Sequence, residues 1–186
     1  GACNACKCWN TLKEFTVRKE TSRSIDMPLS QMREPVAINS IEEKGFERVH
    51  LHFRDLNRLM GDGVVKGSLN LVGGAPGIGK STMMLHIAQQ FAQLGQKVLY
   101  VSGEESLQQT SLRAKRLGVD NASIFLLSET DFTQIKYQVQ NIKPDVFILD
   151  SIQIVYKPEI QSVPGSVTQV KEVAMESMHL AKGMGM

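Results

Sequence analysis

The sequence has no long apolar run, no marked charge imbalance and few aromatic residues. Its 186 residues include no stretch of 18 apolar residues, so we expect no membrane-spanning helix. The net charge of +2 argues neither for nor against nucleic acid as a partner. The sequence shows no internal repeat and no low-complexity tract. Hydrophobic and charged contents of 42% and 22% are typical of a globular protein, and the length suits one ordinary domain.

Cysteine is absent after residue 8. Cys3 and Cys6 form a C-x-x-C pair, and Cys8 follows too closely to belong to an ordinary zinc knuckle, so we treat it as a bystander. Four-thiolate zinc sites usually take two such pairs, and only one is present here. The pair therefore reads as half of a zinc site. A redox C-x-x-C motif and incidental cysteines are the alternatives, and no strand-then-helix context supports the redox reading.

A glycine-rich loop carries the most informative motif. It reads Gly74-Ala75-Pro76-Gly77-Ile78-Gly79-Lys80-Ser81, followed by Thr82, and matches the phosphate-binding pattern G-x-x-x-x-G-K-[ST]. Glycines let the backbone turn its amide groups toward phosphate oxygens, and a helix N-terminus favours an anion. We expect Lys80 to face the β and γ phosphates of a nucleotide and Ser81 to hold Mg²⁺. An apolar run at 69–72, which we interpret as a strand, and a helical pattern from Met83 to Leu94 argue against a chance match.

Strand and helix patterns alternate from residue 69 onward. Continuous apolar runs at 98–101, 124–127 and 146–149 predict strands buried on both faces, which is typical of a parallel sheet. Apolar residues at helical spacing lie between and after them, and the expected helices are marked by Leu107, Leu112 and Leu117, by Phe132, Ile135, Val139 and Ile142, and by Val167, Val170, Val173, Ala174, Met178 and Ala181. The fold class is therefore α/β, with a mainly parallel sheet and helices on both faces.

Acidic residues follow two of these strands. Asp150 ends the run at 146–149, and four apolar residues followed by Asp are typical of a carboxylate that holds Mg²⁺ near a phosphate loop. Glu104 and Glu105 follow the run at 98–101, where a carboxylate could orient the water that attacks a phosphate. Each pattern has a structural alternative: Asp150 as a helix cap or surface acid, and the glutamates as acids beside a helix that Ser106 caps.

We expect three segments along the chain. Residues 1–12 would be the partial zinc module, residues 13–45 a polar linker with Pro28 and Pro35, and residues 46–186 the α/β core. Within the core, Val49, Leu51 and Phe53 alternate like a strand, and a short helix follows them. The first residue is Gly, and the last helical pattern runs almost to Met186, so we expect a fragment that lacks both ends.

The sequence resembles the RadA (Sms) family of bacterial DNA-repair ATPases, relatives of RecA. The resemblance covers almost the whole chain, and the matching segments are 3–6, 9–12, 67–69, 73–82, 98–106, 112–114, 148–153 and 164–170. Segments 102–106 (Ser-Gly-Glu-Glu-Ser) and 164–170 (Pro-Gly-Ser-Val-Thr-Gln-Val) are far more specific than the phosphate loop. The resemblance implies a RecA-like P-loop NTPase core preceded by half of a small zinc module.

The resemblance also implies a function and site residues. It implies an ATP- and Mg²⁺-dependent cytoplasmic protein that binds single-stranded DNA, processes branched recombination intermediates, forms hexameric rings and works beside a RecA-type recombinase. Glu104 would be the catalytic glutamate, Glu105 its neighbour and Gln153 a γ-phosphate sensor. The loop at about 156–166 would approach DNA, with Lys157 and nearby Lys171 contacting phosphates. A solvent-exposed connection is the alternative for that loop.

Two other function classes remain open from the sequence. One is a circadian-clock-type RecA-like ATPase that phosphorylates itself or a partner, and the half zinc module argues against it. The other is an adaptor that binds nucleotide and DNA without hydrolysis. ATP turnover with and without single-stranded DNA would separate them.

Overall fold

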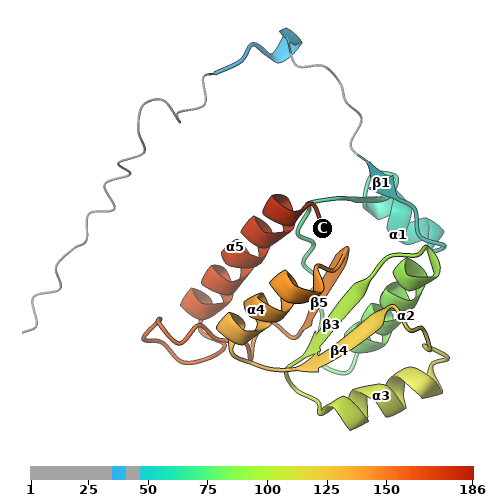
Figure 1. Ribbon diagram of the computed structural model, residues 1–186, viewed down its shortest axis with the longest axis vertical. Helices are drawn as coiled ribbons and strands as arrows, with labels where there is room; N and C mark the ends of the chain where they lie inside the picture. The colour runs from blue at the N-terminus through green and yellow to red at the C-terminus, as the bar shows by residue number, and fades with distance from the viewer. Residues whose placement is uncertain (1–34, 41–46) are drawn as a thin grey trace, which may run out of the picture. The chain divides into compact units, whose positions relative to one another are not determined.

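The structure is a computed structural model, and it describes residues 35–40 and 47–186 (Figure 1). The chain divides into two units, Gly1–Lys44 and Gly45–Met186. In the first unit, the described residues include a short 3-10 helix, η2 (Ile38–Ser40). The second unit holds all the other described elements. No helix in the described part of the chain is long and apolar enough to cross a membrane.

A parallel sheet of three strands forms the centre of the second unit. The strands are β3 (Val98–Ser102), β4 (Ile124–Ser128) and β5 (Val146–Asp150), and their spatial order is β4-β3-β5. Val98 is in register with Ile124 on one side and Val146 on the other, and Ser102 is in register with Ser128 and Asp150. The three predicted apolar runs are therefore confirmed as strands. All five residues of the central strand β3 are buried, as expected for a strand covered on both faces.

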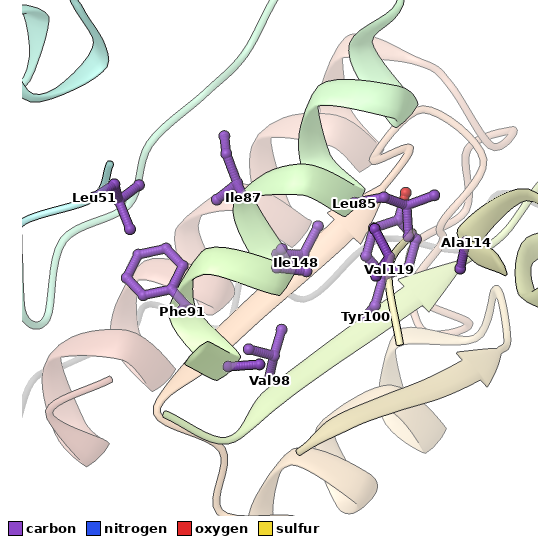
Figure 2. Close-up of a cluster of buried hydrophobic side chains, with 11 residues drawn as sticks. Leu51, Leu85, Ile87, Phe91, Val98, Tyr100, Ala114, Val119 and Ile148 are labelled. Carbon is purple, nitrogen blue, oxygen red and sulfur yellow. The ribbon is translucent and has the colours of Figure 1, made fainter. Parts of the chain in front are cut away.

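Helices cover both faces of this sheet. Alternate residues of β3 point to opposite faces, so Val98 and Tyr100 join one apolar cluster while Leu99 and Val101 join another. The first cluster receives side chains from α2 (Lys80–Gln93) and α3 (Leu107–Arg116), and Figure 2 shows several of them beside Tyr100 and Ile148. The second cluster receives side chains from α4 (Phe132–Ile142) and α5 (Val167–Met184). The predicted α/β class with helices on both faces is confirmed.

A small antiparallel pair precedes the phosphate loop. It joins β1 (Arg48–Val49) and β2 (Val64–Val65), and α1 (Arg54–Leu59) lies between them in the chain. The expected short helix is thus present, but the expected strand is only two residues long. Leu51 lies outside it, where it is buried in the first cluster.

The predicted strand at 69–72 is wrong. These residues form no strand in the structure, and Leu69, Leu71 and Val72 are 47%, 81% and 42% exposed. The chain just before them is fixed elsewhere, because the Gly67 amide donates to the Met186 carbonyl oxygen at 2.7 Å and the Ser68 amide donates to Val65. An apolar run becomes a strand only when a partner strand takes its backbone hydrogen bonds, and this segment has none among the described residues. Among the described residues, the phosphate loop is thus followed by α2 but not preceded directly by a strand.

The helices predicted from Met83 onward are all present as α2, α3, α4 and α5, but not every predicted apolar residue is buried. Phe132, Ile135 and Val139 are buried on α4 as expected. On α3 the predicted apolar residues are correct only in part, since Leu117 packs against the first cluster whereas Leu107 and Leu112 are 46% and 68% exposed. Thr110 and Ala114 are the buried residues of that helix, because its small side chains allow it to lie close to the sheet.

Candidate functional site

The phosphate loop ends at the N-terminus of α2. Gly77 and Gly79 have φ angles of 76° and 101°, a left-handed conformation that glycine adopts without strain. Gly79 is the N-cap of α2, and no side chain caps the helix there. Among the described residues, the Gly77, Gly79 and Lys80 amides donate no hydrogen bond, so these donors remain for an anion.

Lys80 lies within this loop. Its Nζ donates to the carbonyl oxygens of Gly74 at 2.8 Å and Ala75 at 3.0 Å. Its position on the first turn of α2 therefore brings one positive charge against the loop. Ile78 is 71% exposed, and Pro76 is exposed as well, so neither holds the loop against the core.

Asp150 lies at the carboxyl end of β5 and is half-buried. The Tyr100 hydroxyl donates to its Oδ2 at 2.6 Å, and that tyrosine is only 1% exposed. Burial, followed by the hydrogen bond to Asp150 and its negative charge, raises the pKa of Tyr100 well above its ordinary value. The phenol therefore remains a hydrogen-bond donor and fixes one carboxylate oxygen. Since a carboxylate offers two oxygens, Oδ1 remains available for a cation.

Glu104 and Glu105 have different surroundings. Glu104 is exposed, and its Oε1 accepts a hydrogen bond from Ser151 Oγ at 2.8 Å. Glu105 is half-buried and forms an ion pair with Arg113 of α3. The Glu105 amide also donates to Ser102 Oγ at 3.1 Å. The predicted cap is present beside these acids, because Ser106 and Gln109 form a reciprocal capping box at the start of α3.

Residues from four parts of the chain meet in one small cavity of about 30 Å³. Its lining residues are Ser81, Ser102, Glu104, Glu105, Arg113 and Asp150. The sheet explains the meeting, since the carboxyl ends of the parallel strands β3 and β5 share one edge and the N-terminus of α2 faces it (Figure 1). A serine hydroxyl and carboxylate oxygens are ligands that Mg²⁺ accepts, and the free oxygen of Asp150 fits this use.

After β5 the chain forms a bridge at Tyr156 and then continues into the predicted DNA-binding loop at about 156–166. Tyr156 forms a parallel bridge with Asp131, and Val155 is fully buried. Gln153 is exposed and does not line the cavity. The loop continues to Ser166, which caps α5 by accepting a hydrogen bond from the Gln169 amide.

Gln169 fixes the first half of this loop from inside. It is 1% exposed, its Oε1 accepts from the Lys157 amide at 2.9 Å, and its Nε2 donates to three carbonyl oxygens. Those oxygens belong to Lys157, Ile160 and Ser162, at 3.3, 3.2 and 3.0 Å. One side chain on α5 therefore sets the path of residues 157–162.

The two predicted DNA-binding lysines differ in their surroundings. Lys157 Nζ pairs with Glu176 at 2.7 Å and Glu159 at 3.2 Å, and its side chain is 15% exposed. The hydrogen bond to Glu176 raises the pKa of Lys157, although burial opposes it. Burial would raise the pKa of Glu176, but hydrogen bonds from Lys136 and Lys157 outweigh it and lower that pKa. Lys171 is exposed and pairs with no acidic group among the described residues.

The expected zinc ligands Cys3 and Cys6 lie outside the described residues. Within 35–40 and 47–186, no group of three or more His, Cys, Asp or Glu side chains could hold a metal ion. The Mg²⁺ candidates Ser81 and Asp150 are a different kind of site, because a nucleotide's phosphates would complete the coordination.

Four residues of this region escaped the sequence interpretation as site residues: Tyr100, Arg113, Ser151 and Gln169. Tyr100 offered the clearest signal, because a phenol in a fully buried strand needs a hydrogen-bond partner. Arg113 had no signal, since its partner depends on how α3 lies against the end of β3. Ser151 directly follows Asp150, but its hydrogen bond to Glu104 joins the segments after β5 and β3, which are distant in sequence.

The chain is similar in sequence to known proteins. A family profile described as "AAA domain" matches residues 43–163. The chain is 48% identical to "DNA repair protein RadA" of Chlamydia trachomatis serovar D over 182 residues, which is 98% of this chain and 40% of that protein. It is 44% identical to the protein of that name from Bacillus subtilis (100% and 41% covered) and 42% identical to that from Streptococcus pyogenes serotype M1 (98% and 40%).

The chain thus spans about 40% of the length of the curated relatives it matches. The aligned region includes the phosphate loop, both strand ends that carry acidic residues, and the loop before α5, since nearly all of the chain is covered. The chain therefore belongs to the AAA domain family, and the three relatives described above are bacterial proteins named DNA repair protein RadA.

Proposed function

We propose that this protein hydrolyses ATP with Mg²⁺ and acts in DNA repair. The observation that carries the proposal is the meeting of Ser81, Asp150 and Glu104 around one cavity at the end of the phosphate loop. A phosphate-binding loop, a metal carboxylate and a second carboxylate are the parts that ATP hydrolysis requires. The names of the relatives support the repair role.

The loop residues bind and orient the triphosphate. The free amide groups at Gly77, Gly79 and Lys80 donate to phosphate oxygens, and the N-terminus of α2 favours their negative charge. Lys80 exchanges the carbonyl oxygens of Gly74 and Ala75 for the β and γ phosphates. Thr82, the next residue on α2, is half-buried and supports the first turn beside Ser81.

The carboxylates of Asp150 and Glu104 have separate roles, one in metal binding and the other in orienting water. Asp150 and Ser81 would hold Mg²⁺, and the bound ion would supply positive charge to the phosphate oxygens. Glu104 is exposed at the cavity and orients the attacking water or accepts its proton. A γ-phosphate sensor role for Gln153 is supported by the family resemblance alone, since this residue is exposed and lies outside the cavity.

Single-stranded DNA is the proposed partner of the loop at 156–166. Lys171 is the better phosphate ligand in this structure, because its ammonium is exposed. Lys157 reaches a phosphate only by giving up Glu159 and Glu176. The resemblance supports the finer parts of the proposal: branched recombination intermediates as substrates, DNA-stimulated turnover, translocation, a homo-hexamer, a RecA-type recombinase as partner and a cytoplasmic location. A zinc module that includes Cys3 and Cys6 and the division at about residue 45 belong to the same proposal.

The test of the metal site uses Asp150→Asn and a matched control, Asp145→Asn. Both change one carboxylate to an amide near β5, but Asp145 is exposed and outside the cavity. ATP turnover of the full-length protein is measured across a Mg²⁺ titration. We expect Asp150→Asn to lower turnover at least about 10²-fold, the scale on which lost transition-state charge stabilisation acts. Equal turnover of the two variants would contradict the proposal, and ATP binding without turnover in the wild type would favour the adaptor function.

The test of the DNA path compares Lys171→Ala with Lys157→Ala. Loss of a phosphate contact weakens binding to all sequences alike and makes the log–log salt dependence shallower by about 0.7 on single strands. We expect the larger change for Lys171→Ala, since Lys157 is already paired. Basal ATP turnover should stay near normal while stimulation by DNA falls. An unchanged slope and undiminished stimulation in the double variant would show that the loop is only a connection.

A further inference from the structure

Two consecutive glutamates, Glu104 and Glu105, line the cavity, and they differ in exposure and in the contacts they make. The Glu104 carboxylate is exposed and accepts one hydrogen bond, from Ser151. The Glu105 carboxylate is half-buried against Arg113. The backbone of Glu105 is also held on both sides, since its amide donates to Ser102 Oγ and its carbonyl oxygen accepts from Ser128 Oγ at 3.2 Å. Glu105 is therefore fixed at three points, and Glu104 at one.

Arg113 is itself held in place. It lies on α3, whose first turn is fixed by the capping box of Ser106 and Gln109. Ala114, the next residue, is 8% exposed and belongs to the apolar cluster against the sheet. Arg113 forms its ion pair with Glu105 across the first turns of α3. This ion pair links residues 105 and 113, which both line the cavity, and so connects the two ends of the segment between them.

We propose that Arg113 is a positioning residue that keeps Glu105 out of the reaction and sets Glu104 as the carboxylate that orients the attacking water. The inference rests on the proposed ATP hydrolysis and assigns separate roles to the two glutamates. A carboxylate in a charge-assisted pair has lone pairs already in use, whereas Glu104 keeps most of its lone pairs free. Glu104 and Glu105 are adjacent in the chain. Contacts that fix the backbone and side chain of Glu105 therefore also restrict the position of the Glu104 backbone, from which the Glu104 side chain extends.

Arg113 also contributes positive charge to the cavity, and the test must separate this effect from its positioning of Glu105. The cavity lining carries three carboxylates, those of Glu104, Glu105 and Asp150, and one guanidinium. Removing Arg113 would therefore also make the cavity less favourable for an anionic nucleotide. A positioning role acts through Glu105, whereas a direct charge effect on the nucleotide does not require Glu105.

The experiment is a double-mutant cycle of Arg113→Ala and Glu105→Ala in the full-length protein, with kcat and KM for ATP measured at saturating Mg²⁺. Glu104→Gln is measured alongside, and Arg116→Ala is the matched control, because it removes an exposed arginine from the last turn of the same helix. We expect Glu104→Gln to lower kcat at least about 10²-fold. Each cycle variant should lower kcat about 10-fold, a smaller loss than direct removal of the base, since misplacement alone impairs the reaction.

The decisive result is the double variant. If Arg113 acts through Glu105, the double variant should have about the same kcat as either single variant, and Arg113→Lys should recover part of the loss. Multiplying losses would show an independent charge effect and would overturn the inference. A greater loss of kcat in Glu105→Ala than in Glu104→Gln would overturn it as well, because Glu105 would then be the reacting group.

The outcomes also separate the inference from the proposed function. A wild type that hydrolyses ATP, with a cycle in which the effects multiply, contradicts only the role of Arg113. A wild type that binds ATP without turnover contradicts both. Equal thermal stability of the single variants and Arg116→Ala confirms that a change in kcat does not come from unfolding, and the lysine variant serves where Arg113→Ala folds poorly.

Discussion

The hydrogen bond between Tyr100 and Asp150 gives a prediction whose size follows from the structure. Tyr100→Phe removes only the hydroxyl, so the packing of a ring that is 1% exposed is retained. The bond is 2.6 Å long and its acceptor is a carboxylate. Hydrogen bonds to charged groups contribute about 1.5–3 kcal/mol, and the half-buried position of Asp150 favours the lower end. We expect Tyr100→Phe to lower the free energy of unfolding by about 1.5 kcal/mol at pH 8.

The same bond makes this difference depend on pH. The pKa of Tyr100 is raised in the folded protein by burial and by Asp150, whereas an unfolded tyrosine has a pKa of about 10. Below pH 10 the stabilising contribution is complete. Above it the unfolded chain loses a proton that the folded chain keeps, so stability falls as pH rises. One proton gives a loss of about 1.4 kcal/mol at pH 11, so the wild type should lose nearly all of its advantage over the variant there.

Urea unfolding followed by circular dichroism at pH 8, 10 and 11 measures this difference. Tyr137→Phe is the matched control, because its side chain is 57% exposed and we expect it to leave the pH dependence unchanged. A gap between wild type and Tyr100→Phe that stays constant from pH 8 to pH 11 would refute the reasoning. The phenol would then not be a buried donor to Asp150.

Two further predictions concern the segments that surround the site. Gly103→Ala should lower the free energy of unfolding by about 1–3 kcal/mol, because the added Cβ would lie 2.8 Å from Ile154 Cγ1 and closer still to its Cδ1. Gly183→Ala, in α5 with open space around it, should stabilise by up to about 1 kcal/mol, and similar values for both variants in urea unfolding would contradict the close packing. Gln169→Ala should cost about 2–3 kcal/mol, since it leaves the polar backbone groups of Lys157, Ile160 and Ser162 without their partner. Limited proteolysis should then cut within 157–162 faster than in Thr168→Ala, a neighbouring exposed position, and equal rates would show that Gln169 does not set the loop.

The three strands of the sheet could be predicted because their apolar runs are continuous, although only β3 is buried along its whole length. Val98–Ser102, Ile124–Ser128 and Val146–Asp150 each appear in the sequence as such a run. The same rule failed at 69–72, because a local apolar pattern does not say whether a neighbouring strand is present. Helical spacing was also an incomplete guide on α3, where Thr110 and Ala114 are buried and Leu107 and Leu112 are exposed.

The site could be predicted where chemistry is tied to a local motif. The loop at 74–81 and the acid after an apolar run are local patterns, and the structure brings Ser81, Asp150 and Glu104 together. Arg113, Ser151 and Gln169 could not be predicted, since their partners depend on how separate elements pack. The pairing of Lys157 with Glu176 was hidden for the same reason, because a loop residue meets a residue on the third turn of α5.

The central claim is that the loop at 74–81 binds ATP so that it is hydrolysed, and Lys80→Ala tests it most directly. ATP binding and turnover of the full-length protein are compared for the wild type, Lys80→Ala and Lys115→Ala, an exposed lysine of α3 that lies outside the cavity. The account predicts that Lys80→Ala weakens ATP binding and lowers turnover at least about 10²-fold, while Lys115→Ala behaves like the wild type. Turnover at the wild-type rate in Lys80→Ala would contradict it.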